Sequence, residues 1–307
     1  MPAIDVVHAR VFALEAGGGN PCPVVLAADG LGEGEMRALA RRFGLDTVFV
    51  LRPRAPGADL RLRYFLPERE MGFSGHATIA ALRAWRMVTG DPRAELRFET
   101  ANGVFGAMLT ARDGDAARGD DVDVSLATGV PAFGRVLAPE DVAAALGVAP
   151  AAVDVSAGPV QIVGAPRAKV LVPLVGHAAL DAVAPDFALL WGLCERWSAT
   201  GFYPFTLRPE RTSSSADARQ FPYRAGFPED PATGVAAAAL AAYLAHHERA
   251  RADGTRADGP REYTFLQGRA MGAPSRIAAR AVLRGGEVVD TAVAGSAVIT
   301  GRERVAL

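Results

Sequence analysis

Lysine is almost absent from this chain of 307 residues. Of its 33 lysine and arginine side chains only Lys169 is a lysine, and no glycine-rich phosphate loop precedes it. Schiff-base chemistry and phosphate-binding loops both need a lysine, so neither is indicated. Cysteine is scarce too. Cys22 and Cys194 cannot form a disulfide framework, and no CxxC or HExxH pattern occurs, so the sequence predicts no metal site.

The chain also lacks an excess of either charge. The 33 basic and 34 acidic side chains leave a formal net charge of −1, which argues against a nucleic-acid or anionic-membrane partner. No apolar run approaches the ~20 residues of a membrane span. The first residues, MPAIDVVHARVF, lack the basic and apolar regions of a signal peptide. We therefore expect a soluble, cytoplasmic protein.

Two helical segments stand out among many short apolar strands. Residues 75–88 and 234–248 are small or apolar on nearly every side, which is typical of buried helices. The sequence predicts an α/β fold of two similar halves, residues 1–125 and 126–307. We expect the link between them near the polar segment 112–121, and a surface loop at the polar segment 209–218. Each half should be a curved, mostly antiparallel sheet or barrel wrapped around one central helix, with the active site between the halves. Whether the last strand pairs back with the first half is left open.

The starts of these two helices carry the residues best suited to chemistry. A helix N-terminus presents unpaired backbone N–H groups and a partial positive charge, so it binds carboxylates. If both helices point at one cleft, that cleft would hold an anion between His76 and Asp230. The alternative is structural: Asp230 and Thr233 cap a core helix, and His76 is a buried, hydrogen-bonded histidine.

Motifs along nearly the whole chain occur in the order found in one known family. They are Gly19-Asn20-Pro21, Arg63-Tyr64-Phe65, Pro67-Glu68, Gly75-His76-Ala77-Thr78, Arg219 with Phe221, Glu229 to Gly234, Gln267-Gly268 and Pro274-Ser275. In this order they resemble the PhzF-like phenazine-biosynthesis isomerase family, which has the diaminopimelate-epimerase-like fold.

The resemblance implies a cofactor-independent isomerase that moves a proton on a small cyclic or unsaturated amino or carboxylic acid, and it suggests a homodimer. It implies catalytic roles for Asp46, His76 and Asp230, of which the first would be the acid/base and the other two would orient the substrate. The substrate-binding residues would be Asn20, Ser74, Gly75, Ala77, Thr233, Gly234 and Val235.

Three positions depart from the family pattern. Asp46 stands where the family has the glutamate that acts as acid/base, after a loop that is one residue shorter. An apolar setting raises a carboxyl pKa, which suits a group that acts as base and then acid. However, the side chain of aspartate is one methylene shorter than that of glutamate. A carboxylate misplaced by ~1 Å can lower the reaction rate ~100-fold. Ser74 replaces a frequent cysteine and Val235 a frequent serine. Without thiols at the helix starts, a two-cysteine racemase is excluded.

These departures keep other interpretations open. Asp46 could be a turn residue that bonds its own backbone. The protein could be a catalytically degenerate binding protein on the same fold, or a dehydratase or cyclase that uses the same site. Cys22 could border the cleft, although a buried and inert thiol is the simpler interpretation.

Overall fold

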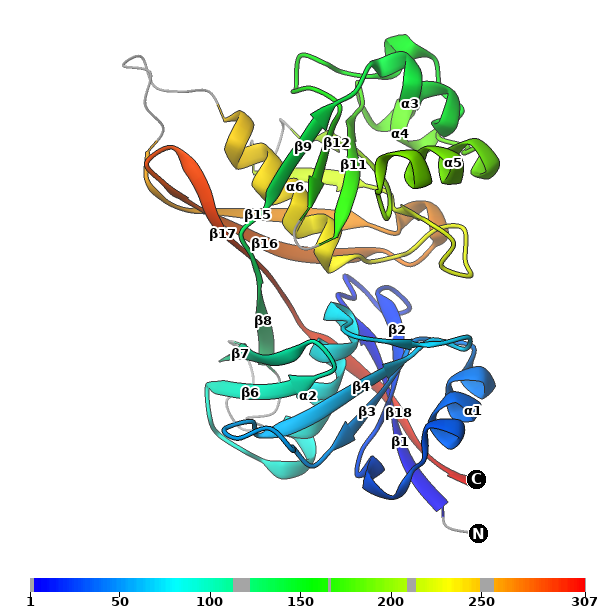
Figure 1. The fold of residues 1–307 in the computed structure, drawn as a ribbon, viewed down its shortest axis with the longest axis vertical. Coiled ribbons are helices and arrows are strands. Elements are labelled where there is room, and N and C mark those ends of the chain that lie inside the picture. Colours follow the sequence, from blue (N-terminus) through cyan, green and yellow to red (C-terminus); the bar gives the residue numbers. More distant parts are fainter. Residues whose placement is uncertain (1–2, 113–121, 165–166, 209–213, 249–256, 307) are drawn as a thin grey trace. The chain divides into compact units, whose positions relative to one another are not determined.

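A computed structural model describes residues 3–112, 122–164, 167–208, 214–248 and 257–306, and Figure 1 shows its ribbon. The chain forms two compact units. Unit 1 comprises residues 1–126 and 294–307, and unit 2 comprises residues 127–293. Both units combine strands with helices. No helix of the described residues is long and apolar enough to cross a membrane.

Unit 1 is a mostly antiparallel sheet. Its strands are β1 (Ala3–Val11), β2 (Asn20–Val25), β3 (Thr47–Leu51), β4 (Leu60–Phe65), β5 (Glu70–Met71), β6 (Glu95–Thr100), β7 (Gly103–Ala111), β8 (Val122–Gly129) and β18 (Ala297–Ala306). The pairs β2–β3 and β4–β6 are parallel, whereas β18–β1, β1–β2, β3–β4, β4–β5, β6–β7 and β7–β8 are antiparallel. Strand β8 continues past the boundary into unit 2.

The central helix of unit 1 is α2 (Gly75–Thr89), which contacts β1, β2, β3, β4 and β18. It starts after Ser74, whose backbone is extended, and ends at Gly90, whose φ of 65° is left-handed. Small side chains let strands approach it from several sides, so most of its residues are buried. A short 3₁₀ turn, η1 (Ala28–Gly30), and the amphipathic helix α1 (Glu33–Phe43) cover another face of the sheet.

Unit 2 repeats this plan with more helices outside the sheet. Its strands are β9 (Ala132–Val136), β10 (Gln161–Gly164), β11 (Ala168–Pro173), β12 (Gly201–Leu207), β13 (Ser215–Ala218), β14 (Phe221–Pro222), β15 (Gly259–Gln267), β16 (Ser275–Arg284) and β17 (Glu287–Gly295). Its helices are α3 (Pro139–Leu146), η2 (Pro150–Ala152), α4 (His177–Asp181), α5 (Phe187–Trp197), α6 (Gly234–His247) and η3 (Arg269–Met271).

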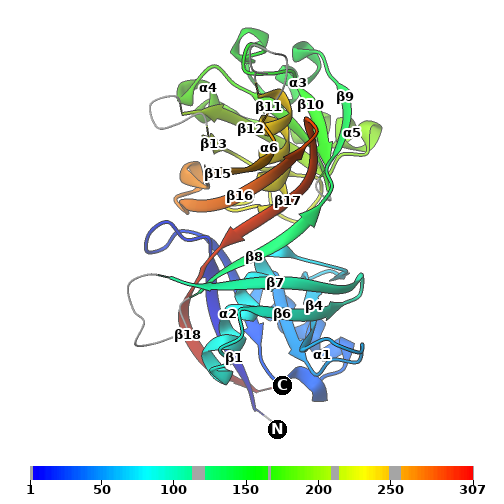
Figure 2. The same ribbon diagram turned by 90° about the vertical axis from the view of Figure 1, so that its left-hand side faces the viewer.

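Helix α6 is the central helix of unit 2. It contacts β10, β11, β15 and β16, and Figure 2 shows it lying against these strands. Alanine fills most of its buried positions. Helices α3 and α5 cover other side chains of β10, β11 and β12 and close a second apolar cluster. The predicted fold class, with one central helix in each half, is confirmed.

The last strand pairs back with the first half, which the sequence left open. Residues 294–307 belong to unit 1, because β18 pairs with β1 from Ala3↔Ala306 to Val11↔Ala297. The polar segment 209–218 reads as a surface loop, yet Ser215–Ala218 is the buried strand β13, held between β12 and β15. Residues 209–213 lie outside the described residues, as do residues 113–121 of the expected link between the halves.

Candidate active site

The start of α2 is fixed by a chain of buried hydroxyl groups. Thr78 makes the first helical hydrogen bond, from its N–H to the Ser74 carbonyl at 3.0 Å. Its hydroxyl donates to the same carbonyl at 2.7 Å and accepts from the Tyr64 hydroxyl at 2.7 Å. Burial raises the pKa of Tyr64, so it remains a donor. The N–H groups ahead of Thr78 thus occupy the position at which helices bind carboxylates.

The structure brings Asp46, His76 and Ser74 together at this helix start. Asp46 directly precedes β3, and its Oδ2 lies 3.7 Å from Nε2 of His76, the second residue of α2. The opposite ring nitrogen, Nδ1, lies 3.4 Å from the Ser74 hydroxyl. The side chains of Asp46 and His76 are 17% and 13% exposed, so the pair is largely shielded from water but still reachable. Such a pair can pass a proton to and from a ligand.

Cys22 lies close behind Asp46. The parallel register of β2 and β3 pairs Val24 with Val48. Cys22 and Asp46 each lie two residues before this pair, so they occupy neighbouring positions. Cys22 is 1% exposed, and burial together with the nearby Asp46 charge raises the pKa of its thiol well above the ordinary value. It is therefore a neutral, buried thiol and not a nucleophile. Asn20 lies at the start of the same strand, opposite Val11.

In unit 2 the start of α6 is held by a network around Gln267. The Gln267 Oε1 accepts from the Thr233 N–H at 3.2 Å and from the Tyr203 hydroxyl at 3.0 Å, while its Nε2 donates to the Asp230 carbonyl at 2.6 Å. The Asp230 Oδ2 accepts from the Thr233 hydroxyl at 2.5 Å. Burial, and then the Asp230 charge, raises the pKa of Tyr203. Asp230 and Thr233 therefore lie together, directly before Gly234 and Val235.

Gln267 and Tyr203 were not predicted as site residues. The pair Gln267-Gly268 is visible in the sequence as a motif, but its contact with residue 230 depends on the pairing of β15 with β13. Gly268 closes this network against the loop before α6. Its φ is +81°, and an added Cβ would lie 2.3 Å from the Ala273 oxygen and 2.7 Å from the Pro231 oxygen.

The Gly268→Ala variant should therefore be destabilised by about 2–5 kcal/mol, which combines the cost of a left-handed backbone with that of overpacking. Gly272→Ala is the matched control. Gly272 has a φ of +66° but nothing within 4 Å of the added Cβ, so only the backbone cost of about 1–2 kcal/mol applies. Urea unfolding of both variants measures the difference. Equal losses would show that the close approach at Gly268 does not constrain the loop.

An arginine–glutamate clamp precedes each central helix, and it repeats between the units. In unit 1, Arg63 donates to both oxygens of Glu70, each at 2.7 Å. In unit 2, Arg219 donates to both oxygens of Glu229, at 2.9 and 2.8 Å. Each arginine also stacks on the phenylalanine two residues later. The arginine Cζ lies 5.1 Å from the ring centroid of Phe65 in unit 1 and 4.9 Å from that of Phe221 in unit 2.

The register of the clamps repeats as well. Each glutamate lies five residues before the first glycine of its helix. Tyr64 pairs with Met71 in unit 1, and the equivalent Gln220 pairs with Asp230 in unit 2. The arginines are visible in the sequence as motifs, but their glutamate partners were not predicted. The clamps hold the loops that carry the candidate site residues.

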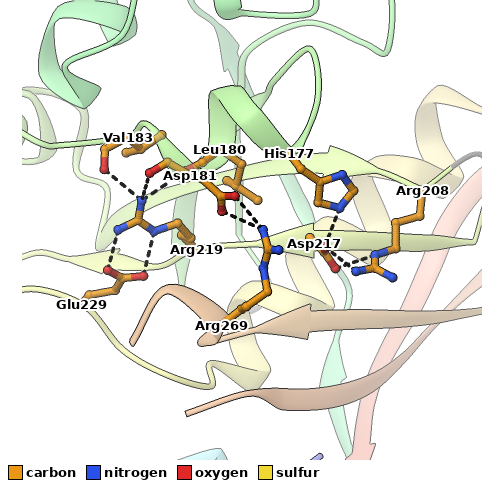
Figure 3. Close-up of polar contacts among 9 residues, drawn as sticks. All are labelled: His177, Leu180, Asp181, Val183, Arg208, Asp217, Arg219, Glu229 and Arg269. Carbon is orange, nitrogen blue, oxygen red and sulfur yellow. Dashed lines mark hydrogen bonds and ion pairs between the residues drawn. The ribbon is translucent and has the colours of Figure 1, made fainter. Parts of the chain in front are cut away.

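Figure 3 shows the clamp of unit 2 with its surroundings. Arg219 also donates through Nη1 to the carbonyls of Leu180 and Val183, at 3.1 and 2.9 Å, at the end of α4. At the other end of α4, His177 Nε2 lies 2.6 Å from Asp217, which also receives two hydrogen bonds from Arg208. Helix α4 is thereby tied at both ends. Among the described residues, no group of three or more metal-binding side chains could hold a metal ion.

The geometry defines an α/β protein with a carboxylate–histidine pair at one helix start and an acidic helix start in its second unit. The family model described as phenazine biosynthesis-like protein matches residues 9–302. The uncharacterized isomerase YddE of Escherichia coli (strain K12) is 31% identical over 300 residues, which cover 96% of each chain. The trans-2,3-dihydro-3-hydroxyanthranilate isomerase of Pseudomonas aeruginosa is 32% identical over 286 residues, or 93% of each chain.

Solved structures agree with these sequence matches. The crystal structure of the phenazine biosynthesis protein of the PhzF family from Bacillus anthracis matches this chain with a TM-score of 0.87 and 27% identity, over 100% of both chains. The chain belongs to the phenazine biosynthesis-like (PhzF) family. Because the relatives above are named isomerases, the chain is placed with the isomerases, as the resemblance predicted.

Proposed function

We propose that this protein is a cofactor-independent isomerase that moves a proton between two carbons of a small cyclic or unsaturated amino or carboxylic acid. The observation that carries the proposal is the distance of 3.7 Å between Asp46 Oδ2 and His76 Nε2 at the start of α2. A relative is named for its action on trans-2,3-dihydro-3-hydroxyanthranilate, which is a cyclic, unsaturated amino acid. That name supports the proposed class of substrate.

Asp46 acts as base and then as acid. Its carboxylate removes a proton from one substrate carbon, and the electron pair of that C–H bond enters the neighbouring double-bond system. The same proton then returns from Asp46 to another carbon, so the substrate gains and loses no atoms. His76 orients the substrate beside Asp46 and can share the proton, because contacts that are long without substrate shorten when it binds.

The helix starts bind the charged groups of the substrate. Backbone N–H groups around Gly75 and Ala77 receive the substrate carboxylate, where the helix dipole stabilises negative charge. In unit 2 the Asp230 carboxylate accepts hydrogen bonds from an amino or hydroxyl group, and the N–H groups around Gly234 and Val235 bind a further acidic group. That both helix starts serve the same substrate molecule remains a prediction.

Hydrogen–deuterium exchange tests the proposed function. The protein is incubated in D₂O with trans-2,3-dihydro-3-hydroxyanthranilate and with related cyclic amino acids, and carbon-bound deuterium is followed by NMR. We expect deuterium to enter a substrate or product carbon, and to enter far more slowly in the Asp46→Asn variant. Binding without any exchange, across substrates that bind, would overturn proton transfer and favour a binding protein on the same fold.

A further inference from the structure

The only lysine of the chain is buried in unit 2 close to the candidate site. Lys169 lies on β11 and is 4% exposed, and its Nζ donates to the Thr200 carbonyl at 3.2 Å. Strands β11 and β12 are parallel with Val170 opposite Phe202, so that Lys169 lies beside Gly201. A buried ammonium is costly unless other groups compensate its charge.

Pairings between neighbouring strands connect Lys169 with Asp230 through Gly201 and Gln220. Gly201 pairs with Pro222, and a Cβ added to Gly201 would lie 2.5 Å from Nε2 of Gln220. Gln220 in turn pairs with Asp230, whose N–H donates to the Gln220 carbonyl at 3.0 Å. These pairings thus put Gly201 and Gln220 between Lys169 and Asp230, in one region of the sheet, although the four residues are far apart in sequence.

Gln220 marks this region as unusually polar. Its side chain is fully buried, and neither Nε2 nor Oε1 has a hydrogen-bond partner among the residues that the structure describes. Buried amides normally have their hydrogen bonds satisfied, so an amide of this kind points to a functional polar cluster or to ordered water. Lys169 and Gln220 together supply more hydrogen-bond donors than the described protein groups accept.

The electrostatics of Lys169 connect it to Asp230. Burial, and then the nearby Arg167 charge, lowers the pKa of Lys169 to about 8, against the opposing effects of Asp230 and Cys194. The groups that shift this pKa come from three elements: Arg167 lies just before β11, Cys194 on α5, and Asp230 in the loop before α6. The thiol of Cys194 is neutral, since burial raises its pKa to about 12. Asp230 is therefore the anion that compensates Lys169.

We infer that Lys169 is a positioning residue for Asp230. Its buried ammonium stabilises the charged carboxylate, and Gln220 fixes the backbone from which that carboxylate projects. The interaction is reciprocal, because the favourable energy between two charges acts equally on both. A charged Asp230 accepts hydrogen bonds but cannot donate one, so the substrate group that it binds must be a donor, such as an amine or a hydroxyl. This inference rests on the proposed role of Asp230 in substrate binding.

The single lysine makes the coupling directly measurable without a substrate. In protein labelled with [ε-¹³C]lysine, one ε-carbon signal reports the titration of Lys169. We expect its midpoint near pH 8, and a clearly lower midpoint in Asp230→Asn, because the variant lacks the anion that favours the ammonium. Asp181→Asn in the same unit removes an exposed carboxylate that pairs with Arg269 and should leave the midpoint unchanged. An unchanged midpoint in Asp230→Asn would overturn the inference.

Activity then tests the positioning role. Lys169→Met, which replaces the ammonium by an apolar chain of similar length, should raise KM about tenfold and move the acid limb of the kcat/KM profile to higher pH. Lys169→Arg should restore the acid limb in part. A merely structural lysine would reduce the folded fraction without moving the limb, and that result would also overturn the role. The NMR titration does not depend on turnover, so a failure of the proposed function would leave the measured coupling intact.

Discussion

Replacing Asp46 by asparagine should lower turnover by ~100-fold or more, because the variant keeps the volume of the side chain but removes the base. The position of Asp46 indicates that the substitution should affect catalysis and not folding. Asp46 lies 3.7 Å from His76 at the start of α2, and its side chain is only 17% exposed. An amide at this position can still form hydrogen bonds, so we expect cooperative unfolding close to that of the unchanged protein. Steady-state kinetics on a verified substrate measure the loss.

Two further variants sharpen this prediction. Asp46→Glu restores the glutamate of the family in a shorter loop and should retain part of the activity or change the preferred substrate. Asp5→Asn is the matched control, because it makes the same chemical change at an aspartate that is 70% exposed and pairs with the surface residue Arg304. It should leave turnover unchanged. Full activity of Asp46→Asn would contradict the proposed role of Asp46 as the acid/base.

The sequence predicts the local parts of this fold well. Segments 75–88 and 234–248 were expected as buried helices, and the helices run from Gly75 to Thr89 and from Gly234 to His247. Their apolar residues and initial glycines are local signals, which a sequence displays directly. The resemblance to the family predicted that Asp46 would face His76 across a substrate-sized gap, whereas the structure places Oδ2 and Nε2 3.7 Å apart. Spacing alone could not bring these residues together, since strands β3, β4 and β5 lie between them in the sequence.

Contacts set by sheet register were much harder to predict. Strand β13 has the polar composition of a loop, but its Asp217 is buried because Arg208 compensates its charge and His177 hydrogen-bonds to it. The pairing of β18 with β1 joins the first and last strands of the chain. The sequence of neither strand indicates which strand it pairs with. The same holds for the cluster of Lys169, Gln220 and Asp230. Each of these residues reads as an ordinary polar residue until the strands place them together.

The clamp of unit 2 should be the polar interaction whose loss costs this unit most. The side chains of Arg219 and Glu229 are only 13% and 12% exposed, and Arg219 also serves the carbonyls at the end of α4. Arg219→Ala would leave the Glu229 carboxylate buried without its cation. Removing one partner of a buried pair typically costs about 3–5 kcal/mol. We expect a loss of this size in urea unfolding.

A nearby exposed pair provides the control. Arg269 and Asp181 are 58% and 53% exposed, so Arg269→Ala should cost at most about 1 kcal/mol. Reversing the clamp with Arg219→Glu and Glu229→Arg should not restore stability, because a glutamate cannot donate to the carbonyls of Leu180 and Val183. Similar small losses in Arg219→Ala and Arg269→Ala would contradict the clamp. A large loss in Arg219→Ala that the reversed pair repairs would mean that charge pairing alone holds the loop before α6.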